Sequence, residues 1–250
     1  MGLFRKIWAL YGVIVFSTIW LLVIPFYLII FFLFPRKGTE WLIWFSHHVL
    51  TNIILALTLV KVKVEGKEKI DPNTSYIIVS NHQTAVDFIA NAIAFPGIYR
   101  FLAKHELIKV PVFGYIIKRF CVLVDRSSAA SRAKSIMYLK KVLEQGVSVF
   151  IYPEGTRNTG EEILGDFQKG AFRLAIQTGT PIAVHTIVNM NDISSVSGSP
   201  DLSPGVLRII WDDPIETKNL TTEDVPQLIQ TVRSQMINHL REAEKQFDVL

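Results

Sequence analysis

Residues 76–87 read YIIVSNHQTAVD, and residues 147–157 read VSVFIYPEGTR. In both stretches a short apolar run, rich in β-branched and aromatic residues, ends in a polar loop, which is typical of a buried strand followed by a turn. The two runs predict strands over Tyr76–Ser80 and Val147–Tyr152. Polar side chains capable of acid–base chemistry and anion binding are therefore expected where these two strands end.

The first polar loop contains His82 and Asp87. On a continuous helix five residues turn by about 500°, so these side chains would point about 140° apart. They can meet only if His82 lies in the loop and Asp87 in the first turn of the next helix, a bend that Asn81 and Thr84 favour. A carboxylate that holds one imidazole nitrogen leaves the other free to take a proton from a hydroxyl. The alternative is a hydrogen-bonded histidine beside an acid that only stabilises the helix N-terminus.

The second polar loop, Pro153–Arg157, suits an anion, because Gly155 lets backbone N–H groups approach closely and Arg157 offers a bidentate fork for a phosphate. The alternative is a polar turn with a solvated arginine. Two further cations, Lys104 and Arg126, follow two other predicted strands. In an open parallel sheet the carboxyl ends of the strands line one crevice where ligands bind. One base and several cations in that crevice suit a substrate with a hydroxyl and a phosphate.

Strands and helices alternate along this part of the chain. Further strands are predicted over Val60–Val64, Tyr99–Ala103, Cys121–Asp125, Pro181–Val188 and Val206–Trp211. Helices are predicted over Ala85–Phe95, Ala129–Gln145, Lys169–Thr178 and about Val225–Gln246, and Gly146 and Gly179 are expected as C-cap glycines. This alternation predicts an α/β domain over residues 61–250, with a central, largely parallel sheet flanked by helices.

Residues 1–60 differ in composition, since no charged residue occurs from Ile7 to Phe34 or from Trp41 to Val60. As helices these runs would be about 42 Å and about 30 Å long, enough for a hydrocarbon core of ~30 Å. A signal peptide is disfavoured because the first run is too long and lacks a small-residue cleavage site. The length of both runs also disfavours a buried core hairpin. We predict a membrane-embedded helical hairpin over residues 1–60, with Pro25 kinking or breaking its first helix.

The mode of insertion is open to two interpretations. If both helices cross the membrane, the turn at Arg36 and Lys37 lies opposite the α/β domain, against the positive-inside tendency. His47 and His48 would also be costly in lipid. A bent hairpin within one leaflet avoids both problems and is favoured, and spanning is the alternative.

Charge and the remaining histidines narrow the classes of function. The net charge of +4 suits an anionic membrane surface and is too small to indicate nucleic-acid binding. The single cysteine, Cys121, excludes an intrachain disulfide framework. We find no convincing metal site, because His105 lacks the second histidine of a zinc helix and His185, in an apolar strand, is expected to be a hydrogen-bonded core residue.

The two loops together resemble a known family. Residues 81–87, NHQTAVD, and residues 152–157, YPEGTR, are similar to the paired motifs of the glycerolipid acyltransferases, most closely the lysophosphatidate (1-acylglycerol-3-phosphate) acyltransferases. The resemblance extends over about Lys61 to Val188. This sequence departs mildly from the family pattern, since the family usually has Ser in place of Thr84 and Phe in place of Tyr152. Around Arg126 the departures are larger.

The resemblance implies an enzyme in which His82, oriented by Asp87, deprotonates the sn-2 hydroxyl of 1-acylglycerol 3-phosphate for attack on an acyl thioester, making phosphatidic acid. It implies that the glycerol phosphate is bound by Glu154, Gly155, Thr156, Arg157, Arg126 and Lys104. It implies no bound cofactor, with acyl-CoA or acyl-carrier protein as the acyl donor, membrane lipids as partners, and a catalytic domain on the cytoplasmic side of the membrane. The alternatives are another acceptor, such as glycerol 3-phosphate or a different lysophospholipid, hydrolysis of the thioester, or a non-catalytic lipid-binding protein.

Overall fold

The computed structural model describes residues 2–35, 37–84, 86–109, 112–124, 129–160, 162–195 and 200–247. Its strands are β1 (Val60–Glu65), β2 (Ile77–Ser80), β3 (Tyr99–Lys104), β4 (Cys121–Val124), β5 (Ser148–Ile151), β6 (Ile182–Ile187) and β7 (Gly205–Trp211). Its α-helices are α1 (Gly2–Leu33), α2 (Lys37–Phe45), α3 (Thr51–Leu57), α4 (Asp87–Ala94), α5 (Phe113–Phe120), α6 (Ala129–Glu144), α7 (Gly170–Thr178), α8 (Met190–Ile193) and α9 (Val225–Phe247). Each strand and each α/β-domain helix expected from the sequence is present, with ends that differ by a few residues.

The strands form one seven-stranded sheet in the order β1-β7-β6-β2-β5-β3-β4. Four neighbouring strands, β2, β5, β3 and β4, run parallel, and β6 is parallel to β2. The β6–β7 pair is antiparallel, and β1 runs parallel to β7. The predicted α/β class and largely parallel sheet are confirmed. The reversal at β6–β7 was not foreseen.

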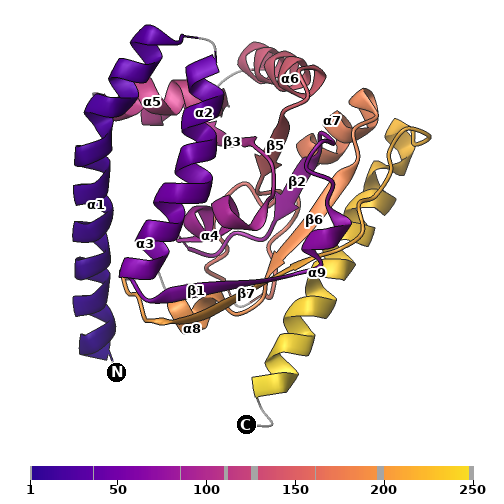
Figure 1. The fold of residues 1–250 in the computed structure, drawn as a ribbon. Coiled ribbons are helices and arrows are strands. Elements are labelled where there is room, and N and C mark those ends of the chain that lie inside the picture. Colours follow the sequence, from indigo (N-terminus) through magenta and orange to yellow (C-terminus); the bar gives the residue numbers. More distant parts are fainter. Residues whose placement is uncertain are drawn as a thin grey trace.

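Helices cover both faces of the sheet (Figure 1). On one face α6, α7 and α9 bury apolar side chains such as Leu143, Phe172 and Val232 against the strands. On the other face α3, α4 and α8 pack together with the N-terminal part of α1. Gly179 ends α7 with a φ of 61°, the left-handed conformation expected of a C-cap glycine.

The N-terminal hairpin differs from the sequence expectation in two details. Pro25 lies inside α1, which continues for 32 residues, so the proline does not break the helix. The predicted second helix is divided into α2, a π-helical turn over Ser46–Leu50, and α3. An interior proline removes one helical hydrogen bond and can kink a helix without ending it, so the expected break is absent and the expected kink stays a prediction.

The hairpin is extended by a helix that the sequence did not reveal. Ile116 of α5 is buried in a cluster with Tyr27 and Phe31 of α1 and with apolar residues of the hairpin's second arm. α5 lies behind one end of the hairpin in Figure 1. Within the described residues, Gly2–Leu33 is the one helix long and apolar enough to cross a membrane, and only 11% of its most apolar window is buried. An exposed apolar surface of this size marks a site of membrane or protein association.

Candidate active site

The loop between β2 and α4 is held by hydrogen bonds of the Asn81 side chain and of the His82 backbone. The side-chain amide of Asn81 donates to the Ile187 carbonyl and accepts from the Ile187 N–H of β6, both at 2.9 Å. The N–H of His82 donates to Glu154, and the carbonyl of His82 accepts from the N–H of Asn158, both at 2.8 Å. The backbone on either side of the His82 side chain is therefore held by two neighbouring strands.

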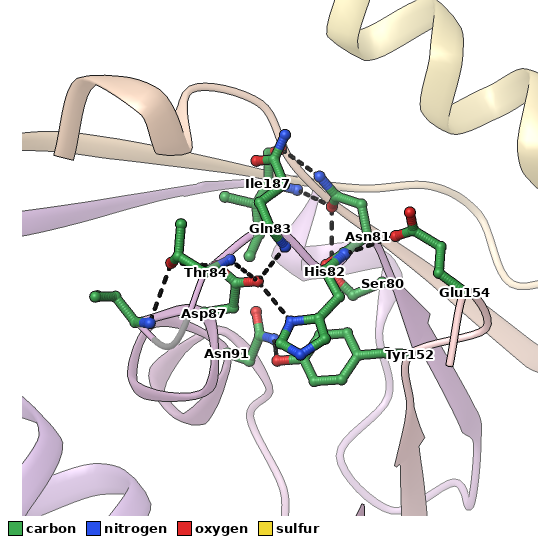
Figure 2. Close-up of polar contacts among 11 residues, drawn as sticks. Ser80, Asn81, His82, Gln83, Thr84, Asp87, Asn91, Tyr152, Glu154 and Ile187 are labelled. Atoms are coloured by element: carbon green, nitrogen blue, oxygen red, sulfur yellow. Dashed lines mark hydrogen bonds and ion pairs between the residues drawn. The ribbon is translucent and has the colours of Figure 1, made fainter. Parts of the chain in front are cut away.

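His82 and Asp87 meet as the sequence analysis requires. His82 lies in the loop, α4 begins at Asp87, and His82 Nδ1 is 2.8 Å from Asp87 Oδ2 (Figure 2). Asp87 is fully buried and also accepts hydrogen bonds from the N–H groups of Gln83 and Thr84 and from the Thr84 hydroxyl. Because a carboxylate accepts from Nδ1–H, the Nε2 atom of His82 is left as the proton acceptor.

Glu154 has a different position from the one expected of a phosphate ligand. One carboxylate oxygen accepts from the N–H of His82 and the other from the N–H of Gly165, both at 2.8 Å. Burial raises the pKa of Glu154 above its ordinary value, and the two N–H donors partly offset this effect. This geometry makes Glu154 a clamp on the His82 backbone, because two N–H donors already engage its oxygens. Direct contact between Glu154 and a phosphate stays a prediction.

The rest of this loop faces outward. Gly155 has a φ of 76°, in the left-handed region that favours glycine, and Thr156 and Arg157 are exposed. Arg157 lines a largely apolar cavity of about 400 Å³ together with Gln83 and Thr84 of the His82 loop. The apolar lining comes from α1, α3 and α4 and includes Gly12, Val13, Phe16, Ile54, Leu55, Phe88 and Ile89. The loop thus joins a cationic side chain to a space suited to a hydrocarbon chain.

Two expected ligands cannot be placed in the same detail. Lys104 is the last residue of β3, on the same edge of the sheet as the His82 loop, and only its backbone is described. Arg126 lies outside the described residues. Their roles as phosphate ligands stay predictions.

Two residues beside His82 were not assigned a role from the sequence. The ring of Tyr152 lies against the His82 imidazole, and Asn91 of α4 donates to the Tyr152 hydroxyl (Figure 2). The signal for Asn91 was its spacing, because a residue four positions after Asp87 lies on the same face of a helix. Tyr152 was visible only as a departure from the family pattern.

Of the other histidines, His239 also pairs with an acid, since its Nε2 lies 2.9 Å from Asp212 Oδ1, and this hydrogen bond raises the pKa of His239 above its ordinary value. His185 is fully buried, and burial lowers its pKa to about 3, so it is neutral. We expected a hydrogen-bonded core residue, but neither ring nitrogen of His185 has a partner among the described residues. Among all the residues that the structure describes, no group of three His, Cys, Asp or Glu side chains is placed to hold a metal ion.

The acyltransferase family model matches residues 61–188, the part of the chain that holds the His82–Asp87 pair and the Arg157 loop. The chain belongs to this family. It is 32% identical over 195 residues to "1-acyl-sn-glycerol-3-phosphate acyltransferase" of Borreliella burgdorferi, an alignment covering 76% of this chain and 75% of that protein.

A mammalian relative supports this assignment, and a solved structure has a similar fold. The chain is 32% identical over 186 residues to mouse "1-acyl-sn-glycerol-3-phosphate acyltransferase alpha", covering 73% of this chain and 65% of that protein. Thus just under two thirds of the mouse protein's length is matched. The fold resembles that of the LPA acyltransferase PlsC from Thermotoga maritima, with a TM-score of 0.76, 23% identity, and coverage of 95% of this chain and 98% of that one.

Proposed function

We propose that this protein transfers a fatty acyl group from an acyl thioester to the sn-2 hydroxyl of 1-acylglycerol 3-phosphate, which makes phosphatidic acid. The observation that carries the proposal is the hydrogen bond between His82 and the buried Asp87, on a loop that lines an apolar cavity with Arg157. The names of the relatives, which are acyltransferases for this acceptor, support it.

In this reaction Nε2 of His82 accepts the hydroxyl proton while the hydroxyl oxygen attacks the thioester carbonyl. The tetrahedral intermediate then collapses, the carbon–sulfur bond breaks, and the proton passes from His82 to the leaving thiolate. Asp87 keeps Nδ1 as the protonated nitrogen and stabilises the imidazolium that forms. Because Asp87 is buried away from water, the attraction between its carboxylate and the imidazolium is stronger.

The acceptor has one anionic and one apolar end, and the site offers a partner for each. Arg157 supplies a charged fork for the phosphate, and the hydroxyl of the exposed Thr156 supplies a further donor. Lys104 and Arg126 are the additional cations of this proposal. The cavity between α1, α3 and α4 is apolar enough to hold a hydrocarbon chain of one of the substrates.

The donor is an acyl thioester of coenzyme A or of acyl-carrier protein, and the chemistry above needs no bound cofactor. Residues 61–250 would form the catalytic domain, and residues 1–60 would hold it on the membrane. Fully extracting an acyl chain of about sixteen carbons into water would cost on the order of 10 kcal/mol. A membrane-held site avoids this cost because the tail stays in an apolar environment.

Contacts at both ends of α1 support insertion within one leaflet, with the catalytic domain on the cytoplasmic side. Near its start, Arg5 pairs with Asp201 of the α/β domain at 3.2 Å. Just after its end, the Pro35 carbonyl accepts from Arg119 of α5 at 3.3 Å. A helix that contacts one domain at both ends runs along that domain, whereas a spanning helix would leave it.

A cysteine at the hairpin turn tests this topology. Gly38 is a poor position, because an added Cβ would lie 2.9 Å from the Ile30 side chain, whereas Lys37 is exposed. The native Cys121 is buried. Lys37→Cys should react with a membrane-impermeant thiol reagent only from the side that carries the catalytic domain. Labelling from the opposite side would show that the segments span and would leave the chemistry untouched.

The activity itself is tested with the purified full chain in mixed micelles. Each donor thioester is combined with lysophosphatidate, glycerol 3-phosphate or another lysophospholipid, and products are identified by mass. We expect phosphatidic acid from lysophosphatidate and far less product from the other acceptors. Thioester cleavage that does not depend on any acceptor would instead indicate a hydrolase.

A further inference from the structure

The His82 imidazole contacts one side chain at its edge and another at its face. The rings of His82 and Tyr152 are stacked, with centroids 3.9 Å apart and planes inclined by only 13° (Figure 2). Tyr152 directly follows β5 and precedes the loop that clamps the His82 backbone. Two neighbouring strands therefore bring an imidazole and a phenol into face-to-face contact.

The position of the Tyr152 ring is itself fixed by α4. The side-chain amide of Asn91 donates to the Tyr152 hydroxyl at 2.8 Å, and Asn91 is fully buried. Asn91 lies one turn after Asp87, so both side chains come from the same face of α4. One helix thus holds the edge of the imidazole directly, through Asp87, and the face of the imidazole indirectly, through Asn91 and Tyr152.

We propose that Tyr152 is a positioning residue for the acyl transfer, in which its ring sets the tilt of the His82 imidazole and stabilises the imidazolium that forms as the hydroxyl proton is taken up. This inference rests on the proposed function of His82 as the base. A cation against the face of an aromatic ring is attracted by the ring's negative face, and the attraction grows as the site is desolvated. Because the proposed mechanism places a positive charge on His82 as the hydroxyl proton is taken up, the stack favours the transition state.

The Tyr152 hydroxyl serves this arrangement without taking part in proton transfer. Burial, reinforced by the negative charge of Asp87, raises the pKa of Tyr152 well above its ordinary value, so the phenol stays neutral. Its hydroxyl is also engaged by Asn91. The aromatic ring is the active part, and the hydrogen bond from Asn91 holds the hydroxyl end of the ring in place.

Three variants of the full chain separate a positioning role from packing. Tyr152→Leu removes the ring, Tyr152→Phe keeps the ring and removes the bond to Asn91, and Phe150→Leu removes a buried ring that contacts Tyr152. The turnover number and the Michaelis constants for donor and acceptor are measured for each, alongside thermal unfolding. Wild-type activity and its loss in His82→Ala are established first, so a failure of the proposed function is recognised separately.

We expect Tyr152→Leu to lower the turnover number by at least ~10-fold with Michaelis constants within ~2-fold of wild type, because only the charged state loses a partner. Tyr152→Phe should retain turnover within ~3-fold, because the stack remains. Phe150→Leu should lower stability without this selective loss of turnover. If Tyr152→Leu does not fold, Tyr152→Met, whose unbranched side chain adapts to an irregular space, takes its place. Wild-type turnover in a folded non-aromatic variant, or an equal loss in Phe150→Leu, would overturn the proposal.

Discussion

The N-terminal hairpin and the catalytic edge of the sheet are held in opposite ways. The hairpin leaves large apolar side chains such as Leu22 and Phe32 exposed, and polar contacts tether α1 to the α/β domain near its two ends. At the sheet edge, Asp87 is fully buried and accepts hydrogen bonds from the N–H groups of Gln83 and Thr84. Under the proposed function, the hairpin would determine where the reaction occurs and the sheet edge how fast it proceeds. Substitutions in the two regions should therefore affect different measurements.

The largest effect is expected where the base itself is removed. His82→Ala should lower turnover by at least ~10²-fold in a folded protein, since general-base catalysis typically contributes that much or more. Asp87→Asn should also be severe, because the imidazole loses the acceptor that selects its tautomer. Initial rates at saturating donor and acceptor, with thermal unfolding as the folding control, measure both. Near-normal turnover in folded His82→Ala would end the proposed mechanism.

A smaller but still large effect is expected at Glu154, whose carboxylate accepts from the N–H groups of His82 and Gly165. Glu154→Gln replaces one accepting oxygen by an NH₂ group that faces a backbone N–H, either of His82 or of Gly165. An unsatisfied buried donor typically costs about 1–3 kcal/mol, so the unfolding temperature should fall. The displaced His82 loop should also lower turnover by about 10-fold. If Glu154→Gln raises only the Michaelis constant for lysophosphatidate, Glu154 is a phosphate ligand, as the family resemblance implied.

Arg157 should affect acceptor binding more than turnover. Arg157→Lys keeps the charge but loses the bidentate fork, so the Michaelis constant for lysophosphatidate should rise by about 5- to 10-fold. The Michaelis constant for the donor should change little. An Asn158→Ala variant, altered at the next residue along the loop, is a control for loop distortion. A rise in the donor constant instead would mean that this loop binds the other substrate.

The sequence predicts the catalytic pair better than its surroundings. The bend that unites His82 and Asp87 follows from their spacing, because no continuous helix would bring them together. The position of both loops at one sheet edge follows from the strand–helix alternation. Contacts between strands distant in sequence carry no such local signal. This is why the clamp by Glu154 and the stacking of Tyr152 on His82 emerge only in three dimensions.

Prediction of the fold from the sequence has the same limit. Strand and helix positions follow local periodicity and were foreseen, whereas the antiparallel β6–β7 pair depends on which strand β7 joins. α5 was missed because only eight residues form it and Ile116 is buried against the hairpin. Pro25 was expected to break or kink α1, and α1 is not broken there. Helix propensity alone does not predict whether the rest of a long apolar helix offsets the loss of one hydrogen bond.

The smallest effect is expected at the tether between the hairpin and the α/β domain. Arg5→Ala removes the partly exposed ion pair with Asp201 and the bonds to the carbonyls of Asn191 and Asp192, and such contacts contribute on the order of 1 kcal/mol. The unfolding temperature at neutral pH should fall by roughly 2–4 °C, while turnover on detergent-dispersed acceptor stays unchanged. Lys6→Ala, at an exposed neighbouring position, is the matched control.

The pH dependence of this tether gives an independent check. Burial alone would raise the pKa of Asp201, but hydrogen bonds from Ser195 and Arg5 outweigh it and hold the pKa below its ordinary value. A carboxyl group whose folded pKa is depressed stabilises the fold above its unfolded pKa of about 4 and loses this contribution as the pH falls through the folded value. The difference in unfolding temperature between wild type and Arg5→Ala should thus be full at pH 7 and shrink below about pH 4. A difference independent of pH would mean that the carbonyl contacts, and not the Asp201 pair, hold the start of α1.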